Sequence, residues 1–388
     1  MSKRKVFLVL LTISFLCGCS NANNQPEPNP EEIEPIYQNS KYTNSLFVTN
    51  QDESVTPFLG ADPDIIKGDD GYFYLYTSQN FVYLKDEGRT LDYCPIYRSD
   101  DMVNWEYCSS AFLKQDVNLD EFCYPGFGIW APSINHFYDR YYLYYSIGYT
   151  KGEYTKYMGI GLAISDTPYG PWEHYGQLFT SEECGVPVSI DPFAFQEDDG
   201  TIYLIWGSYY GIYAVEMTID GIEVKDKANI KTNKIQIITD TFDMSKNYEG
   251  TYIFKKDGKY YFTGSKNGYI GEGGGLNSKY NVYSGCSNSL LGPYLGSDGN
   301  DVFGGGDLVI DGDFDHDDGL RGVGHNSVIM DDKGDYWLVY HCYDPNCPIK
   351  DERTICIDKL IFEENGTFHT ENFVASHTEK DGPSIRVN

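Results

Sequence analysis

One hairpin motif recurs five times along the chain, and this repetition restricts the possible fold more than any other feature. Each copy has an apolar strand, a short polar turn and an aromatic-rich strand. Asp-Gly and Lys-Gly turns between two such strands indicate hairpins, because glycine reaches positive φ at little cost. The copies are DPDIIKGDDGYFYLYTS from Asp62, WAPSINHFYDRYYLYYS from Trp130, DPFAFQEDDGTIYLIWGS from Asp191, EGTYIFKKDGKYYFTGS from Glu249 and HNSVIMDDKGDYWLVYH from His325.

The spacing of the copies predicts the architecture. Their starts lie 68, 61, 58 and 76 residues apart, and each interval holds a second, weaker pair of strands. Four strands per unit, repeated radially, are typical of a β-propeller. The sequence therefore predicts an all-β, five-bladed β-propeller from about Leu46 to Phe368. A β-sandwich with coincidentally similar turns is the alternative, and five copies in phase disfavour it.

Composition excludes two other classes of protein. The net charge is −29, from 29 Lys and Arg against 58 Asp and Glu, so the surface repels phosphate backbones and nucleic-acid binding is not expected. Aromatic residues make up 16% of the chain, which supplies enough apolar surface for a folded core and excludes disorder of the whole chain.

The N-terminus is typical of an export signal followed by a lipid anchor. A basic start and an apolar run over residues 6–15 precede Leu16-Cys17-Gly18-Cys19, which resembles a bacterial lipobox. We therefore expect a signal peptide over residues 1–18, lipid on Cys19, and a flexible Asn-, Pro- and Glu-rich stalk over residues 19–45. Residues 46–388 form the predicted propeller with a short C-terminal tail. The lipobox predicts an exported chain anchored by lipid to the bacterial cell envelope; the alternative is an ordinary secretory signal with incidental cysteines.

The starts of the five motifs carry the candidate catalytic residues. The innermost strands of a propeller line its central channel, so equivalent positions of the blades converge at one mouth of that channel. These positions hold three carboxylates, an indole and an imidazole, namely Asp62, Trp130, Asp191, Glu249 and His325. Carboxylates beside aromatic rings suit a sugar, and glycoside cleavage needs one carboxylic acid and one carboxylate.

Five short motifs at the heads of the blades resemble those of glycoside hydrolase family 43. They are Asp62-Pro63, Trp130-Ala131-Pro132, Ser189-Ile190-Asp191-Pro192, Glu249-Gly250-Thr251 and Gly324-His325-Asn326. Further stretches resemble the arabinan endo-1,5-α-L-arabinosidase branch, including GFGIWAPSIN at 126–135, GVPVSIDP at 185–192 and SLLGPY at 289–294. Arg353 with CIDKLIF at 356–362 resembles the family's closing-blade arginine and strand. The resemblance covers about residues 46–368.

The resemblance implies a role for each of these residues. Asp62 matches the general base, Glu249 the general acid, and Asp191 a third carboxylate whose charge would keep the acid protonated. Inversion of configuration is implied, with the base and acid carboxyls roughly 6.5–9.5 Å apart. His325 matches a residue facing a calcium ion in the channel, with water completing the coordination shell; a hydrogen-bonded histidine without metal is the alternative. Trp130 is expected to stack on sugar or to pack within its blade, and Ser189 and Ser208 to line the pocket.

The predicted function is cleavage of α-1,5-linked L-arabinan, or of a related arabinoxylan-type oligosaccharide of plant cell walls, by a monomer. An exo-acting α-L-arabinofuranosidase or β-xylosidase on the same fold is one alternative. A non-catalytic glycan-binding surface lipoprotein is another, although the chain keeps all three carboxylates. Two segments depart from the family pattern: Lys266–Gly275, where the arabinanase branch often has two cysteines, and the acidic run Asp311–Asp318. The first leaves endo or exo action open.

Overall fold

Each of the five hairpin motifs supplies an innermost strand and its neighbour in a separate sheet. The structure is a computed structural model that describes residues 35–113, 127–149, 154–239, 247–272, 274–313 and 319–387. The chain divides into a short unit that ends at Ile36 and a large unit that starts at Tyr37. The large unit is a five-bladed β-propeller, as predicted.

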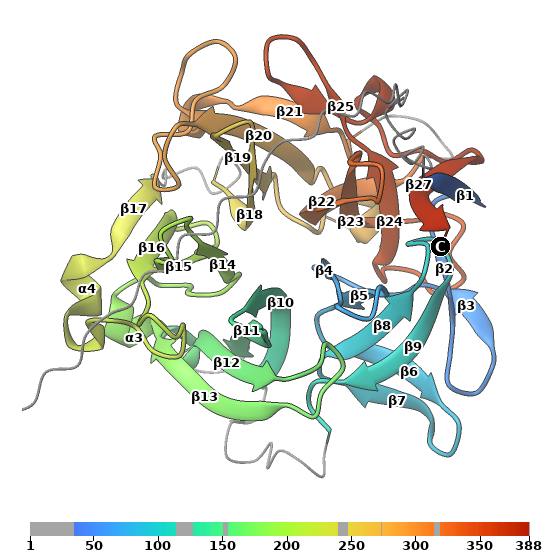
Figure 1. Ribbon diagram of the computed structural model, residues 1–388, viewed down its shortest axis with the longest axis horizontal. Helices are drawn as coiled ribbons and strands as arrows, with labels where there is room; N and C mark the ends of the chain where they lie inside the picture. Colours follow the sequence, from blue (N-terminus) through green and yellow to red (C-terminus); the bar gives the residue numbers. More distant parts are fainter. Residues whose placement is uncertain are drawn as a thin grey trace, which may run out of the picture. The chain divides into compact units, whose positions relative to one another are not determined.

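Apart from one parallel pairing at the outer edge of blade 1, each blade is an antiparallel sheet whose first strand is innermost (Figure 1). Blade 1 contains β4 (Asp64–Lys67), β5 (Phe73–Tyr76), β8 (Pro95–Ser99) and β9 (Trp105–Ser110), extended by β2 (Phe47–Thr49) and β3 (Val55–Pro57). Blade 2 contains β10 (Phe127–Phe137), β11 (Arg140–Tyr149), β12 (Gly159–Ser165) and β13 (Glu173–Thr180). Blade 3 contains β14 (Phe193–Gln196), β15 (Ile202–Trp206), β16 (Ile212–Glu216) and β17 (Ile235–Ile238).

The last two blades complete the ring. Blade 4 contains β18 (Glu249–Lys256), β19 (Lys259–Lys266), β20 (Asn281–Ser287) and β21 (Asp307–Ile310), and blade 5 contains β22 (Arg321–Met330), β23 (Tyr336–Tyr343) and β24 (Thr354–Lys359). In Figure 1 the strands β4, β10, β14, β18 and β22 face the centre of this ring.

The remaining elements decorate the blades. Three pairs of strands lie outside the blade sheets: β1 (Ile36–Tyr42) with β27 (Lys380–Val387), β6 (Asn80–Leu84) with β7 (Gly88–Asp92), and β25 (Ile361–Phe362) with β26 (Phe368–His369). The helical turns are α2 (Tyr154–Tyr157), α3 (Ser181–Cys184), α4 (Ile230–Asn233), η1 (Lys227–Asn229), η3 (Gly275–Asn277), η4 (Val302–Gly304) and η5 (Glu371–Phe373). Within the described ranges, no helix has the length and apolar character that a membrane crossing needs.

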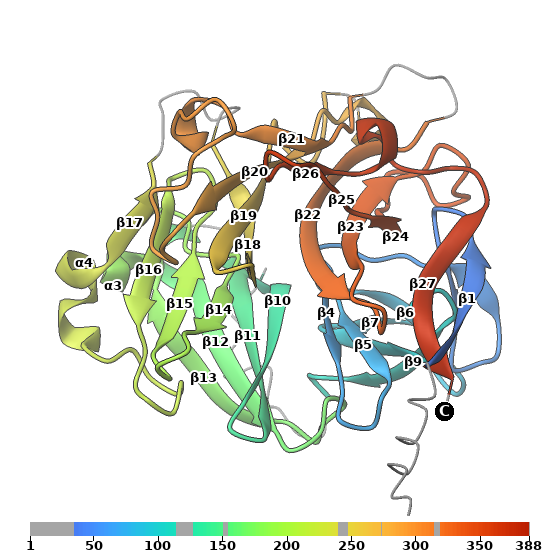
Figure 2. The same ribbon diagram turned by 45° about the horizontal axis from the view of Figure 1, so that its top comes forward.

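The ring is closed by the segment that precedes β4, which lies along β24 of the last blade (Figure 2). The amide of Ile355 donates to the carbonyl of Phe58 at 2.9 Å, and the amide of Gly60 donates to the carbonyl of Arg353 at 2.9 Å. These bonds give the three-stranded blade 5 an additional edge partner, so that segments far apart in sequence share one blade.

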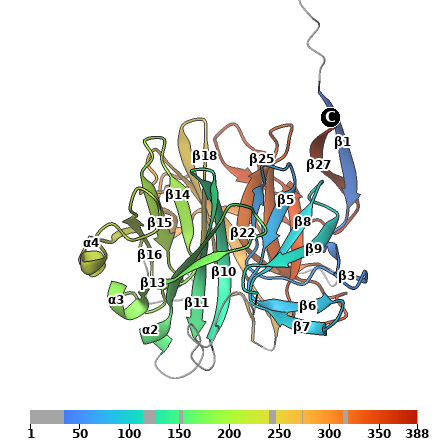
Figure 3. The same cartoon turned by 60° about the horizontal axis from the view of Figure 1, so that its bottom comes forward.

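The folded unit begins before Leu46, which corrects the predicted boundary of the stalk. Strand β1 pairs with β27 (Figure 3), so residues expected in a flexible stalk are part of the fold. Tyr42 is buried and donates to the Asp358 carboxylate at 3.1 Å. The Asn44 side chain donates to the same carboxylate at 3.1 Å and to the carbonyl of Ile357 at 2.8 Å. Sequence composition did not show this, because the pairing partner lies at the other end of the chain.

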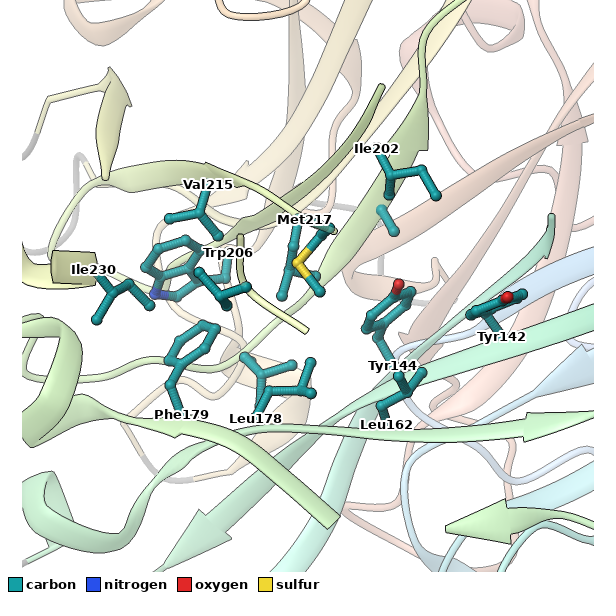
Figure 4. Close-up of a cluster of buried hydrophobic side chains, with 14 of the residues drawn as sticks. Tyr142, Tyr144, Leu162, Leu178, Phe179, Ile202, Trp206, Val215, Met217 and Ile230 are labelled. Carbon is teal, nitrogen blue, oxygen red and sulfur yellow. The ribbon is translucent and has the colours of Figure 1, made fainter. Parts of the chain in front are cut away.

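Hydrophobic cores fill the spaces between neighbouring blades. The core between blades 2 and 3 is shown in Figure 4, where Phe179, Trp206 and Tyr144 lie within one buried cluster. Alternate residues of each strand face such a core, which explains why the strands contain so many aromatic residues. The predicted signal peptide, the lipidation site Cys19 and the first part of the stalk lie outside the described residues, as does most of the acidic run.

Candidate active site

Each blade begins with one residue in the left-handed backbone conformation, just before its innermost strand straightens. The φ angles are +54° for Asp62, +40° for Ala131, +59° for Asp191, +61° for Gly250 and +48° for His325. Left-handed conformations are uncommon for residues other than glycine, so their recurrence at the same place in each blade marks the repeat in the backbone itself.

These angles refine the predicted equivalence of the five motif starts. Trp130 and Glu249 lie one residue before the left-handed position, where Ala131 and Gly250 stand instead. The ladders of β10 and β18 are irregular there, with register shifts between Trp130 and Ser133 and between Glu249 and Tyr252. Hence Trp130 and Glu249 approach the site from a different backbone position than Asp62 does.

A ring of hydrogen bonds between blades fixes most of these starting residues. The backbone amide of Ala131 donates to Ser78 Oγ at 2.7 Å, and that of Asp191 donates to Ser146 Oγ at 2.8 Å. The amide of His325 donates to Ser265 Oγ at 2.8 Å. Each serine is the last residue of the preceding motif, so each of these blades positions the start of the next.

Two junctions of this ring use other side chains. The amide of Gly250 donates to the Asp191 carboxylate at 3.2 Å, and the amide of Asp62 donates to His341 Nδ1 at 3.1 Å. His341 stands where the other four motifs end in serine. The ring of contacts therefore closes through a histidine placed directly behind Asp62.

A pocket of about 260 Å³ opens where the blade starts converge. All three predicted carboxylates line it, together with Trp130 and His325. The complete lining is Asp62, Ser78, Gln79, Trp130, Ile190, Asp191, Glu249, Tyr269, Tyr280, His325 and Arg353. A larger open groove of about 470 Å³ lies on blade 4, but Asp307 is the sole carboxylate on its wall and we do not assign the chemistry to it.

Asp62 lies among positive and polar partners. Arg353 Nη1 donates to Asp62 Oδ1 at 3.1 Å, and His325 Nδ1 lies 3.2 Å from the same oxygen. Ser78 Oγ donates to Asp62 Oδ2 at 2.5 Å. Burial by itself would raise the pKa of Asp62, but the positive charge of Arg353, followed by His325 and the hydrogen bond from Ser78, outweighs it and holds that pKa well below its usual range. Asp62 is therefore an ionised carboxylate, as a general base must be.

His341 is a neutral acceptor behind this carboxylate. It is completely buried, and burial followed by the charge of Arg353 lowers its pKa well below the ordinary histidine value. Its Nδ1 atom accepts the amide of Asp62, which places its proton on Nε2. The ring of Tyr280 is stacked on it, with centroids 5.8 Å apart and planes 12° from parallel.

Asp191 has the opposite environment to Asp62. It is 5% exposed, and burial, then the charges of Glu249 and Asp62, raise its pKa well above the usual value. Sequence reasoning expected an ionised Asp191 beside a protonated Glu249. In the structure the raised pKa of Asp191 contradicts that expectation, because burial beside Glu249 and Asp62 disfavours the ionised form of Asp191.

Glu249 is held by three hydroxyl groups. Ser208 Oγ donates to Oε2 at 2.8 Å, while the hydroxyls of Tyr209 and Tyr280 both donate to Oε1 at 2.7 Å. Glu249 is 6% exposed and lines the pocket, so its carboxyl is fixed in orientation yet can reach a bound substrate.

Two aromatic residues form opposite parts of the pocket wall. The indole of Trp130 lies so close to the backbone of Gly148 that a Cβ atom there would be 2.3 Å from the ring, so the indole requires glycine at that position. Tyr269 comes from the Gly-rich segment that departs from the family pattern, and the Arg353 guanidinium lies 5.1 Å from its ring centre. Tyr269 is 43% exposed, which leaves its ring available to a ligand.

The two predicted pocket serines are placed differently from expectation. Ser189 is completely buried away from the pocket lining, and its hydroxyl accepts the Trp206 indole N–H at 3.1 Å. It therefore contributes to the core of blade 3 rather than to the pocket. Ser208 lies behind Glu249 and is 2% exposed, so it positions the carboxyl rather than facing a substrate.

The calcium ion implied by the resemblance was expected to contact His325, with water completing its coordination shell. Calcium prefers six to eight oxygen ligands. Among the described residues, no group of three or more His, Cys, Asp or Glu side chains could hold a metal ion. Nδ1 of His325 already faces Asp62, whose charge Arg353 balances. The described residues therefore form no cage of protein ligands for calcium, and the expected contact of His325 with a hydrated calcium ion stays a prediction.

Sequence reasoning missed the partners that hold the carboxylates, namely Ser78, His341, Tyr209 and Tyr280. A signal for the first two was present, because four of the motifs end in serine and the fifth ends in His341. The two tyrosines have no such signal: Tyr209 follows a motif directly, and Tyr280 stands in a connection among many other tyrosines.

The fold agrees with comparisons to known proteins. The family model "Glycosyl hydrolases family 43" matches residues 52–368. An extracellular exo-α-(1→5)-L-arabinofuranosidase of Cellvibrio japonicus is 31% identical to this chain in the matched region. The match covers 64% of this chain and 72% of that protein. An extracellular endo-α-(1→5)-L-arabinanase of Bacillus subtilis is 27% identical to this chain in the matched region. That match covers 78% of this chain and 87% of that protein.

Among solved structures, an exo-1,5-α-L-arabinanase from a bovine ruminal metagenomic library is similar, with a TM-score of 0.63 and 26% identity. The similarity covers 81% of this chain and 98% of that one. The motifs at the blade starts, the propeller built from them and the match over most of the chain lead to one conclusion: this chain belongs to glycosyl hydrolases family 43.

Proposed function

We propose that the chain is an inverting endo-acting arabinanase that hydrolyses α-1,5-linked L-arabinan. The observation that carries the proposal is the contrast between two carboxyls of one pocket. Asp62 is kept ionised by Arg353 and its neighbours, whereas Glu249 is held by hydroxyl groups next to an Asp191 with a raised pKa. Glycoside hydrolysis needs one ionised carboxylate and one carboxyl that can deliver a proton.

In the proposed mechanism, Asp62 removes a proton from a water molecule as that water attacks the anomeric carbon. Glu249 gives a proton to the departing glycosidic oxygen, and the bond between that oxygen and the anomeric carbon breaks. Asp191 stays beside the sugar ring and limits the negative charge that the three carboxyls carry together, while Trp130 stacks on a face of the sugar. The carboxyl separation of roughly 6.5–9.5 Å that inversion requires stays a prediction.

The test is digestion of linear arabinan by the exported protein, with products separated by chromatography and the anomer of the first product determined by NMR. We expect a ladder of short α-1,5-linked oligosaccharides and an inverted anomer. Glu249→Ala is expected to reduce hydrolysis by about 10²–10⁴-fold, the usual contribution of a general acid, with substrate binding retained. Equal turnover by Glu249→Ala would show that the acid is another residue.

Exo action is the second candidate, and the position of Tyr269 favours it. Its ring lies against the Arg353 guanidinium at the wall of the pocket, where it would block one end of an open substrate groove. The Cellvibrio japonicus relative is named an exo-acting enzyme, and the Bacillus subtilis relative an endo-acting one. Release of a single short product from the start of digestion would support exo action. Conversion of that pattern to a ladder by Tyr269→Ala would assign the difference to this ring.

We further propose that the protein acts outside the cytoplasm on plant cell-wall arabinan or arabinoxylan-type material as a monomer anchored by lipid on Cys19. Support comes from the lipobox-like residues 16–19 and from the two relatives, which are named extracellular. Mass spectrometry of the mature chain tests the anchor: a diacylated N-terminal cysteine is expected, and Cys19→Ser is expected to release the protein from membranes.

A further inference from the structure

Glu249 has two chemically different oxygens, and their hydrogen bonds decide which one can hold a proton. A carboxylate offers about four in-plane acceptor sites, two on each oxygen. Oε1 accepts the hydroxyls of Tyr209 and Tyr280, each at 2.7 Å, whereas Oε2 accepts the hydroxyl of Ser208 alone, at 2.8 Å. One acceptor site remains, and it is on Oε2.

Both tyrosines are permanent donors in this arrangement. Burial first, and then the charge of Glu249, raise the pKa of Tyr209 and of Tyr280 well above the ordinary tyrosine value, so neither hydroxyl loses its proton. Tyr280 is 1% exposed and its ring is stacked on His341, which fixes the position of its hydroxyl. A Cβ atom on Gly324 would lie 2.2 Å from the Tyr280 ring, so the neighbouring blade needs glycine at this position to make room for the ring.

We propose that Tyr209 and Tyr280 are positioning residues that reserve Oε1 of Glu249 and thereby direct the catalytic proton to Oε2. A proton on Oε1 would break one of two short hydrogen bonds inside a buried site, whereas a proton on Oε2 breaks none. In the reaction Glu249 Oε2–H gives its proton to the glycosidic oxygen, the C–O bond breaks, and the carboxylate left behind keeps its three donors. The hydroxyls therefore stabilise the charge that forms as the acid acts.

The same residue links the acid to the base. Tyr280 donates to Glu249 at one end of its ring, while its face is stacked on His341, whose Nδ1 accepts the backbone amide of Asp62 at 3.1 Å. Replacing the ring would therefore disturb both catalytic carboxyls, whereas replacing the hydroxyl alone would disturb the acid. This separates the two effects experimentally.

The inference rests on the proposed acid role of Glu249, and the test uses Tyr209→Phe, Tyr280→Phe and the double variant. Each single variant is expected to lower kcat on arabinan by about tenfold, with KM little changed, since a hydrogen bond to a charged group is lost. The alkaline limb of the pH–rate profile is expected to move to higher pH, because donors to the ionised carboxylate have been removed. Tyr210→Phe is the matched control, because Tyr210 is adjacent in sequence but its hydroxyl does not hydrogen-bond to Glu249, and both readouts are expected to stay unchanged.

Rescue by a better leaving group distinguishes positioning of a proton from general damage. Arabinosides with a 2,4-dinitrophenol leaving group need no proton from the enzyme, so the phenylalanine variants are expected to cleave them within about twofold of the wild-type rate. Equal losses on both substrates, or an unmoved alkaline limb in variants that melt like the wild type, would overturn the inference. The proposed function is judged separately, from the products of the wild-type enzyme, since the variants are compared on whichever glycoside that enzyme cleaves.

Discussion

Arg353 is the residue whose removal gives the sharpest test of how the site keeps its base ionised. Its guanidinium lies 3.1 Å from Asp62 Oδ1, and the two side chains are 25% and 11% exposed. At this distance and an effective dielectric constant of about 20, the Coulomb attraction is about 5 kcal/mol. Desolvation of both groups cancels part of it, and breaking such a pair by removing one partner typically costs about 3–5 kcal/mol.

Arg353→Met removes the charge and keeps an unbranched side chain of similar length. We expect the free energy of unfolding at neutral pH to fall by about 3 kcal/mol. We also expect the acid limb of the kcat/KM profile to move upward by about 1–3 pH units, because an adjacent cation lowers a carboxyl pKa by that amount. The stability difference has a defined pH dependence. Since Arg353 depresses the folded-state pKa of Asp62, its contribution is complete above the ordinary aspartate pKa and is lost as the pH falls through the depressed value.

A double-mutant cycle isolates the pair. Denaturant unfolding of the wild type, Arg353→Met, Asp62→Asn and the double variant should give a coupling free energy of about 2–4 kcal/mol at neutral pH. A coupling near zero would refute the electrostatic account of the site. So would an Arg353→Met enzyme whose acid limb coincides with that of the wild type.

Three further predictions follow from the same geometry. A chain that starts just before β1 is expected to unfold at the same denaturant concentration as the wild type. A chain that lacks all residues through 45 loses the buried donors to Asp358 and is expected to lose about 3–5 kcal/mol of stability. Equal stability of the two chains would place β1 outside the fold. Gly250→Ala puts a Cβ atom 2.9 Å from His325 at a φ of +61°, and is expected to cost more stability and kcat than Gly258→Ala, where φ is +74° and no atom lies within 4 Å. Treatment with EDTA is expected to leave kcat within about twofold, because Arg353 already balances the charge that a cation would; loss of activity that calcium restores would show that His325 does hold calcium.

The architecture could be predicted because each blade contains a repeated hairpin, which is a local sequence pattern. A strand–turn–strand pattern needs neighbouring residues only, so five hairpins and their phase are visible without any tertiary information. The radial arrangement then follows, and with it the expectation that Asp62, Asp191 and Glu249 share one cavity, where the structure places them. The one-residue offset of Glu249 was not visible, because it depends on an irregular ladder that only the backbone geometry reveals.

What the sequence alone determined is the set of blades and the identity of the groups at their heads. What only the tertiary structure decided is the electrostatic state of those groups: Arg353 reaches Asp62 across 291 residues of sequence, and Tyr280 reaches Glu249 from a separate connection of blade 4. The physical reason is that a carboxyl's affinity for a proton depends on burial and on charges within a few ångströms. Neighbours at that range come from closure of the ring, and local sequence patterns carry no information about them.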